Sequence, residues 1–188
     1  MWYDLRTSLN KKETLVELSG SYQNMQNYFI LNIDNDKFIQ NAPLRGIAQD
    51  GFTPKLLLNA DYLDDVRMGN IPIFSKKFVE ALGDKLQEYI EFYPCLIYLH
   101  DVEYPFYLAR IKNRLSVIDE QKSGYRILTD GSKIIDEPII IREEVNEGLL
   151  IVRDLKYHSH VVVSDLFKQM VEQAKLKIGF MPTNETFW

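Results

Sequence analysis

The pentapeptide Ile90-Glu91-Phe92-Tyr93-Pro94 returns near the end of the chain as Ile178-Gly179-Phe180-Met181-Pro182. In each copy the isoleucine and the phenylalanine are two residues apart, which places both side chains on one face of an extended strand. The closing proline is expected to end each strand, because proline has no N–H to donate to a sheet ladder. The shared I-x-F-x-P pattern therefore predicts two short strands of similar design.

A helical pattern precedes each of these strands. Ser75 and Ser164 each stand three residues before a phenylalanine, where a serine hydroxyl can cap the first turn of a helix. An extended apolar run comes before each serine, at residues 71–74 and 161–163. Apolar residues then recur at helical spacing: Phe78, Val79, Leu82 and Leu86 in the first copy, and Leu166, Phe167, Met170, Val171 and Ala174 in the second. We expect two strand-helix-strand units, with chance likeness between ordinary segments as the alternative.

The chain between the two units reads as β structure. Residues 104–111 and 115–118 are extended and apolar, and Asp130-Gly131 after residues 125–129 predicts a two-residue hairpin turn. Residues 138–141 and 149–152 add two further apolar strands. The predicted fold class is therefore α+β, with a mostly antiparallel sheet and two or three packed helices.

The first seventy residues carry weaker signals. Residues 24–33 and 56–58 look like strands, and residues 41–46 and 50–54 look like turns. No low-complexity linker separates this region from the rest. We therefore expect residues 1–188 to form a single α+β domain.

Composition limits the cellular setting. With 46% hydrophobic residues among 188, the chain can bury a core without a disulfide or a structural metal. The single cysteine, Cys95, lies in an apolar run and is expected to be a buried small side chain in a reducing compartment. The N-terminus has no signal-peptide pattern and no apolar run is long enough to span a membrane. Cytoplasmic localisation, without a membrane partner, is the expectation.

The net charge of -5 bears on the partner. Neutralising phosphates requires a surface of lysine and arginine, so a nucleic-acid partner is not expected. A basic protein partner is compatible with this charge.

Motifs of known chemistry are absent from the sequence. It has no G-x-G-x-x-G, P-loop, H-E-x-x-H or paired C-x-x-C, so we expect neither a cofactor, a metal site nor an enzyme. His158 and His160 would share one face of a strand, which leaves a small metal-dependent hydrolase as an alternative, although no third ligand is recognisable. His100 and Asp101 would point to opposite faces of a strand and could not act as an acid-base pair.

Carboxylates lie beside aromatic residues in one stretch of the chain. Aromatic anchors with flanking charges are typical of protein-binding surfaces. We therefore predict partner binding by Asp101, Glu103, Tyr104 and Phe106.

Six short motifs follow one another along the chain, at residues 71–78, 90–94, 107–111, 116–123, 161–167 and 180–182. Their order resembles a bacterial immunity-protein family, first catalogued as a domain of unknown function and typified by a myxobacterial immunity domain. The resemblance covers an immunity-like core at residues 69–185 and leaves residues 1–68 without a recognisable match. It implies a cytoplasmic antitoxin of the polymorphic toxin systems, with no catalytic residues.

The resulting hypothesis is an immunity protein that binds a cognate polymorphic or contact-delivered bacterial toxin and occludes its active site. The resemblance implies that the toxin is encoded next to it. A non-enzymatic scaffold protein is the other alternative, beside the hydrolase that would use His158 and His160. Homodimerisation through an uncovered sheet edge stays open.

Overall fold

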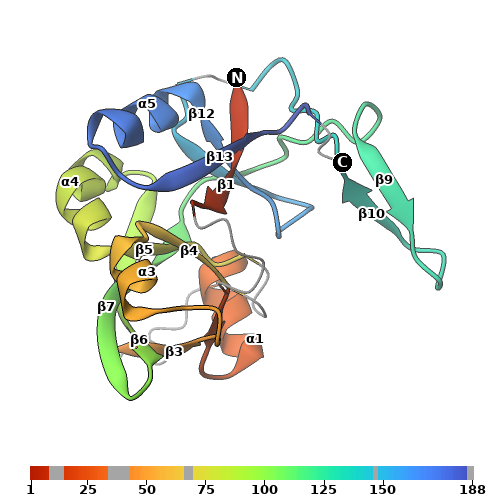
Figure 1. Ribbon diagram of the computed structural model, residues 1–188. Helices are drawn as coiled ribbons and strands as arrows, with labels where there is room; N and C mark the ends of the chain where they lie inside the picture. The colour runs from red at the N-terminus through yellow and green to blue at the C-terminus, as the bar shows by residue number, and fades with distance from the viewer. Residues whose placement is uncertain (9–14, 34–42, 66–69, 146–147, 186–188) are drawn as a thin grey trace.

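The computed structural model describes residues 1–8, 15–33, 43–65, 70–145 and 148–185 (Figure 1). The predicted α+β class is confirmed, because most of the regular secondary structure in the described residues is strand, with a few short helices. The strands form a closed barrel, a five-stranded sheet and a separate two-stranded hairpin. The barrel lies below the five-stranded sheet in Figure 1, and the hairpin projects to the right.

The barrel has the strand order β2-β3-β6-β7-β5-β4. Its interior is filled by apolar side chains such as Val16, Ile97 and Leu108, each fully buried. Helices α1 (Tyr22–Met25), η1 (Gln26–Ile30) and α3 (Pro54–Asn59) add residues to the same core. The strands are β2 (Leu15–Leu18), β3 (Leu44–Ala48), β4 (Tyr62–Asp65), β5 (Ile73–Ser75), β6 (Ile90–Leu99) and β7 (Val102–Ile111).

The five-stranded sheet combines the two ends of the chain, in the order β13-β1-β12-β11-β8. Strand β1, from the N-terminus, pairs antiparallel with β12 on one side and β13 on the other. The N-terminal segment is thus an interior strand of a sheet whose other strands come from residues 114–182. The strands are β1 (Trp2–Thr7), β8 (Arg114–Leu115), β11 (Ile151–Asp154), β12 (Val161–Ser164) and β13 (Ile178–Pro182).

Two helices lie side by side and join the barrel to the sheet (Figure 1). The rings of Phe78 on α4 (Lys76–Leu86) and Phe167 on α5 (Asp165–Gln173) have centroids 6.2 Å apart. Both serine caps are formed as expected: Ser75 Oγ accepts from the Phe78 N–H, and Ser164 Oγ accepts from the Phe167 N–H. These caps fix where each helix begins.

The strand before and the strand after each helix are separated by one antiparallel strand. Strand β7 lies between β5 and β6, and β1 lies between β12 and β13. The registers of the two units correspond position by position. Tyr107 on β7 pairs with Phe74 and Pro94, and Tyr3 on β1 pairs in the same way with Val163 and Pro182. One residue earlier on each middle strand, Phe106 pairs with the capping Ser75 and Trp2 pairs with the capping Ser164.

The correspondence extends to the next two strands. In the barrel, β4 pairs antiparallel with β5, and β2 pairs parallel with β4. In the sheet, β11 pairs antiparallel with β12, and β8 pairs parallel with β11, so β11 corresponds to β4 and β8 corresponds to β2. The place of β3 is taken by an irregular segment, in which the Arg142 N–H donates to Val117 O and the Ile139 N–H donates to Thr183 O. Equivalent positions in the two halves can therefore be compared directly.

Two predicted strands are helical instead. Residues 24–33 fall largely in α1 and η1, and residues 56–58 fall in α3. Ser21 accepts from the Asn24 N–H, and Thr53 accepts from the Leu56 N–H with Pro54 at the first helical position. These capping signals outweigh the strand propensity of the apolar residues that follow.

Other boundaries also differ from the predictions. Pro94 lies inside β6 rather than at its end, which is tolerated because β3 pairs with β6 only from Cys95 onward. The hairpin of β9 (Gly124–Ile127) and β10 (Lys133–Asp136) has a five-residue connection, not a two-residue turn at Asp130-Gly131. The predicted strand at 138–141 is reduced to an isolated bridge between Ile141 and Ile118. The predicted turn at 41–46 overlaps the start of β3, and its residues 41 and 42 lie outside the described chain.

Candidate partner-binding surfaces

The turn between β6 and β7 carries two predicted site residues. Leu99 pairs with Val102, so His100 and Asp101 are the two central residues of the turn and not strand residues as expected. Both have positive φ, 48° and 65°. Glycine and asparagine are preferred in such turns because other side chains are strained there. Two charged or polar side chains are therefore held at an exposed tip despite this conformational strain.

Beside this turn lies a hollow of about 450 Å³ with apolar and charged walls. Ile47 on β3 is 57% exposed beside it. The Arg45 guanidinium lies 5.7 Å from the centre of the Tyr98 ring, and the Tyr98 hydroxyl donates to Glu103. We call this surface the barrel end: Arg45, Ile47, Tyr98, Asp101, Val102 and Glu103.

The four predicted contact residues divide by burial. Asp101 and Glu103 are exposed at the barrel end. Tyr104 and Phe106 are only 8% and 4% exposed, and they pack in the barrel core. The structure thus brings the carboxylates to the surface but turns the aromatic rings inward, where they support β7.

A second surface is the arm, which we define as residues 124–136. It projects from the body of the protein in Figure 1. Tyr125, Ile127 and Leu128 are 54%, 69% and 42% exposed, an unusual concentration of apolar surface on a short hairpin. At its base, a Cβ on Gly124 would lie 2.3 Å from Glu137 O, so only glycine fits this close approach.

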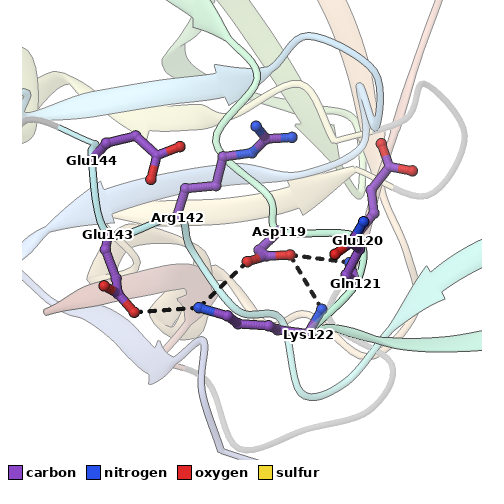
Figure 2. Close-up of a pocket in the computed structure, with 7 residues that line it drawn as sticks. All are labelled: Asp119, Glu120, Gln121, Lys122, Arg142, Glu143 and Glu144. Atoms are coloured by element: carbon purple, nitrogen blue, oxygen red, sulfur yellow. Dashed lines mark hydrogen bonds and ion pairs between the residues drawn. The ribbon is translucent and has the colours of Figure 1, made fainter.

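At the foot of the arm is an acidic pocket of about 440 Å³, shown in Figure 2. Lys122 reaches between two carboxylates there, with Nζ 3.3 Å from Glu143 Oε1 and 3.7 Å from Asp119 Oδ2 (Figure 2). The hydrogen bond to Glu143 raises the pKa of Lys122, so the ammonium stays charged. Because Glu120 and Glu144 also line this pocket, its balance is negative.

A third hollow lies between the sheet, the barrel and the arm. This cleft of about 470 Å³ has Asp4 in its wall, and we call it the Asp4 cleft. Asp4 is on the interior strand β1 and is only 7% exposed. Within the described chain its carboxylate has one ion-pair partner, Arg6 Nη2 at 3.8 Å, and no hydrogen-bond donor. Burial raises the pKa of Asp4 to about 6, while Arg6 lowers it and Glu137 raises it further.

Stability should depend on the ionisation of Asp4. The pKa of an aspartate in the unfolded chain is about 3.9, so the folded state binds the Asp4 proton more tightly than the unfolded state does. The stability that comes from protonated Asp4 is therefore lost as pH rises through 6. Replacing Asp4 with asparagine should remove this loss. Between pH 4.5 and 7.5 we expect the wild type to lose about 2 kcal/mol of unfolding free energy relative to Asp4→Asn. Urea unfolding of both proteins at the two pH values measures this difference. If the unfolding free energies of the wild type and Asp4→Asn change equally with pH, the result contradicts a buried Asp4 carboxylate without a donor.

The histidines considered as metal ligands lie in the connection between β11 and β12, not on a strand. His158 O accepts a hydrogen bond from Arg153, and burial lowers the pKa of His160. No group of three His, Cys, Asp or Glu side chains in the described part of the chain is arranged to hold a metal ion. Cys95 is buried as predicted, and its burial raises the thiol pKa to about 12.

A profile of the immunity protein family Imm11 matches residues 44–182. The chain belongs to this immunity protein family. A search of curated proteins gave no match.

The match to Imm11 begins at β3 and ends with the last residue of β13, so it includes the barrel end, the arm and the acidic pocket. It does not include β1, which supplies Asp4 to its cleft. Sequence reasoning missed Asp4, although a carboxylate inside the apolar run from Trp2 to Leu5 was a visible signal. None of the helices in the described ranges has the length and apolar character needed to cross a bilayer.

Proposed function

We propose that this immunity protein binds a cognate bacterial toxin and neutralises it by covering the toxin's active site. The observation that carries the proposal is the Imm11 match over residues 44–182. The three hollows, beside the barrel end, in the acidic pocket and at the Asp4 cleft, are each lined in part by carboxylates, and the net charge of -5 favours a basic partner surface. Inhibition by occlusion requires a rigid complementary surface and no reactive group.

The setting proposed for this activity is the cytoplasm of a bacterium that competes with its neighbours. The toxin gene is proposed to lie next to the gene for this protein, so that a producing cell is protected from its own toxin. No cofactor, nucleic acid or membrane takes part in the proposed activity.

The barrel end is the proposed contact surface. Asp101 and Glu103 would face basic groups of the toxin, and the exposed Ile47 and Val102 would pack against its apolar rim. Charges of this kind mainly speed association, and buried apolar contacts mainly slow release. Tyr104 and Phe106 would act from beneath by fixing β7 in the barrel.

Coexpression tests the proposed function. The protein encoded next to this gene should be toxic when expressed alone and harmless when this protein is coexpressed. A tagged pull-down at physiological salt should retain the same neighbour. If the neighbour is harmless alone, or if coexpression gives no protection and the pull-down retains nothing, the immunity proposal fails.

The contact surface has its own test. The double variant Asp101→Asn/Glu103→Gln should slow toxin association by roughly 10-fold at low salt, with little change in dissociation, because the lost charges act at long range. Surface plasmon resonance at two salt concentrations measures both rates. The matched control is Glu143→Gln/Glu144→Gln, which makes the same charge change at the acidic pocket. If only the control slows association, the acidic pocket is the contact and the barrel end is not.

A further inference from the structure

Asp4 occupies a position that a leucine fills in the other half of the molecule. Because Tyr3 corresponds to Tyr107 in register, the next residue, Asp4, corresponds to Leu108. Leu108 pairs with Ile73 and Tyr93 and is fully buried in the barrel core, while Asp4 pairs with Val162 and Met181. The strand arrangement therefore accepts an apolar side chain here, and folding alone does not explain the carboxylate.

A carboxylate in this position is energetically unfavourable. Taking a charged group out of water is costly unless it is paired and hydrogen-bonded. Arg6, two residues along the same strand, approaches only to 3.8 Å, and its side chain is 51% exposed. No donor in the described chain lies within hydrogen-bond distance of Asp4, so none of the described side chains satisfies its oxygens.

The other charged groups of the cleft have partners. Asp64 accepts from the Thr7 N–H, Asp65 accepts from the Ile71 N–H, Asp136 pairs with Arg126, and Glu137 has Arg6 at 3.9 Å. His160 also lines the cleft, and burial favours its neutral form. Among the described residues that line the cleft, five carboxylates thus face two arginines and one histidine. The balance of these described groups is negative, and Asp4 is the carboxylate among them without a described donor.

We propose that the Asp4 cleft receives the guanidinium group of an arginine side chain from a bound protein. A planar guanidinium can donate two parallel hydrogen bonds to one carboxylate, which is the pairing that the Asp4 oxygens lack. The cleft of about 470 Å³ has room for such a side chain. Identifying the bound protein as the toxin rests on the proposed function, whereas the cation site itself does not.

Methylguanidinium is a suitable probe for the free protein. At constant ionic strength, carboxyl-detected NMR should show a saturable shift of the Asp4 resonance, with a dissociation constant on the order of millimolar for so small a ligand. Binding should be roughly 10-fold weaker at pH 5 than at pH 7.5, because protonation removes the charge of a group whose pKa is about 6.

Two variants separate this site from surface charge. Asp4→Leu should fold, as Leu108 does at the equivalent position, with a denaturation midpoint at least equal to that of the wild type, and should show no saturable shift at the cleft. Glu120→Gln, at the acidic pocket, should bind methylguanidinium like the wild type. Three results would each overturn the proposal. The chemical shift could change linearly with methylguanidinium concentration, or change equally in Asp4→Leu and the wild type, or it could saturate with magnesium but not with methylguanidinium.

Coexpression with the toxin distinguishes the two proposals. If the cleft binds an arginine of the toxin, folded Asp4→Leu should protect less well than the wild type. Full protection by Asp4→Leu would overturn the arginine site while leaving the immunity function intact. If the wild type itself fails to protect, the function is wrong whatever methylguanidinium does, and the probe titration still decides the cation site.

Discussion

Phe78→Ala is expected to lower the free energy of unfolding by about 4 kcal/mol, within the range for removing a fully buried phenylalanine. Phe78 has no exposed surface. Its ring stacks on Phe74 with centroids 4.1 Å apart, and it also lies 6.2 Å from Phe167 and 6.1 Å from Phe92. Alanine would leave a cavity at the meeting point of these three rings.

The position of Phe78 explains why the whole protein should respond. Phe74 and Phe92 belong to barrel strands, while Phe167 belongs to the helix that covers the five-stranded sheet. Phe74, Phe78 and Phe167 lie in one core cluster shared by the barrel and the sheet, and the partly buried Phe92 packs against it. Loss of Phe78 therefore weakens the contact between the two halves as well as the packing of α4.

Urea unfolding followed by circular dichroism measures this effect, with exposed Leu166→Ala on α5 as the control. The control should change the unfolding free energy by less than about 1 kcal/mol, since little apolar surface is buried there. Phe78→Leu should fall between the two, because leucine fills part of the cavity. A loss for Phe78→Ala no larger than that of the control would contradict the shared core.

The two helices could be predicted from sequence because their signals are local. Ser75 and Ser164 stand beside the apolar spacing that they cap, so a short window contains the whole pattern. The place of β1 could not be predicted in this way. Its pairing with β12 and β13 joins residues more than 150 positions apart, and no local pattern encodes such a contact.

The candidate site was predictable only in part for the same reason. The stretch from Asp101 to Phe106 does place carboxylates at a turn, as the sequence suggested. Tyr104 and Phe106 share strand parity with the buried Leu108, which was a signal that they face inward, but closure of the barrel was needed to say which face is the core. Asp4 becomes notable only once its strand is known to lie in the interior of the sheet.

Arg153 is a second residue whose burial depends on long-range structure. It is fully buried on β11, and burial lowers its pKa to about 10, so it stays charged at neutral pH. Its Nη1 donates to His158 O, and its Nη2 donates to Asn70 O at 2.9 Å. The guanidinium thus ties the connection between β11 and β12 to a residue just before β5 of the barrel.

We expect Arg153→Ala to lower the free energy of unfolding by about 3–5 kcal/mol, because two carbonyl groups lose their donors and the stem of the side chain leaves a cavity. Arg153→Met keeps most of the side-chain volume, so it should lose less unfolding free energy than Arg153→Ala, since only the hydrogen bonds disappear. Arg126→Ala on the arm is the matched control, with a side chain that is 67% exposed. Urea unfolding of the three variants ranks them. If Arg153→Met is as stable as the wild type, the two carbonyls need no donor, and packing alone accounts for the arginine.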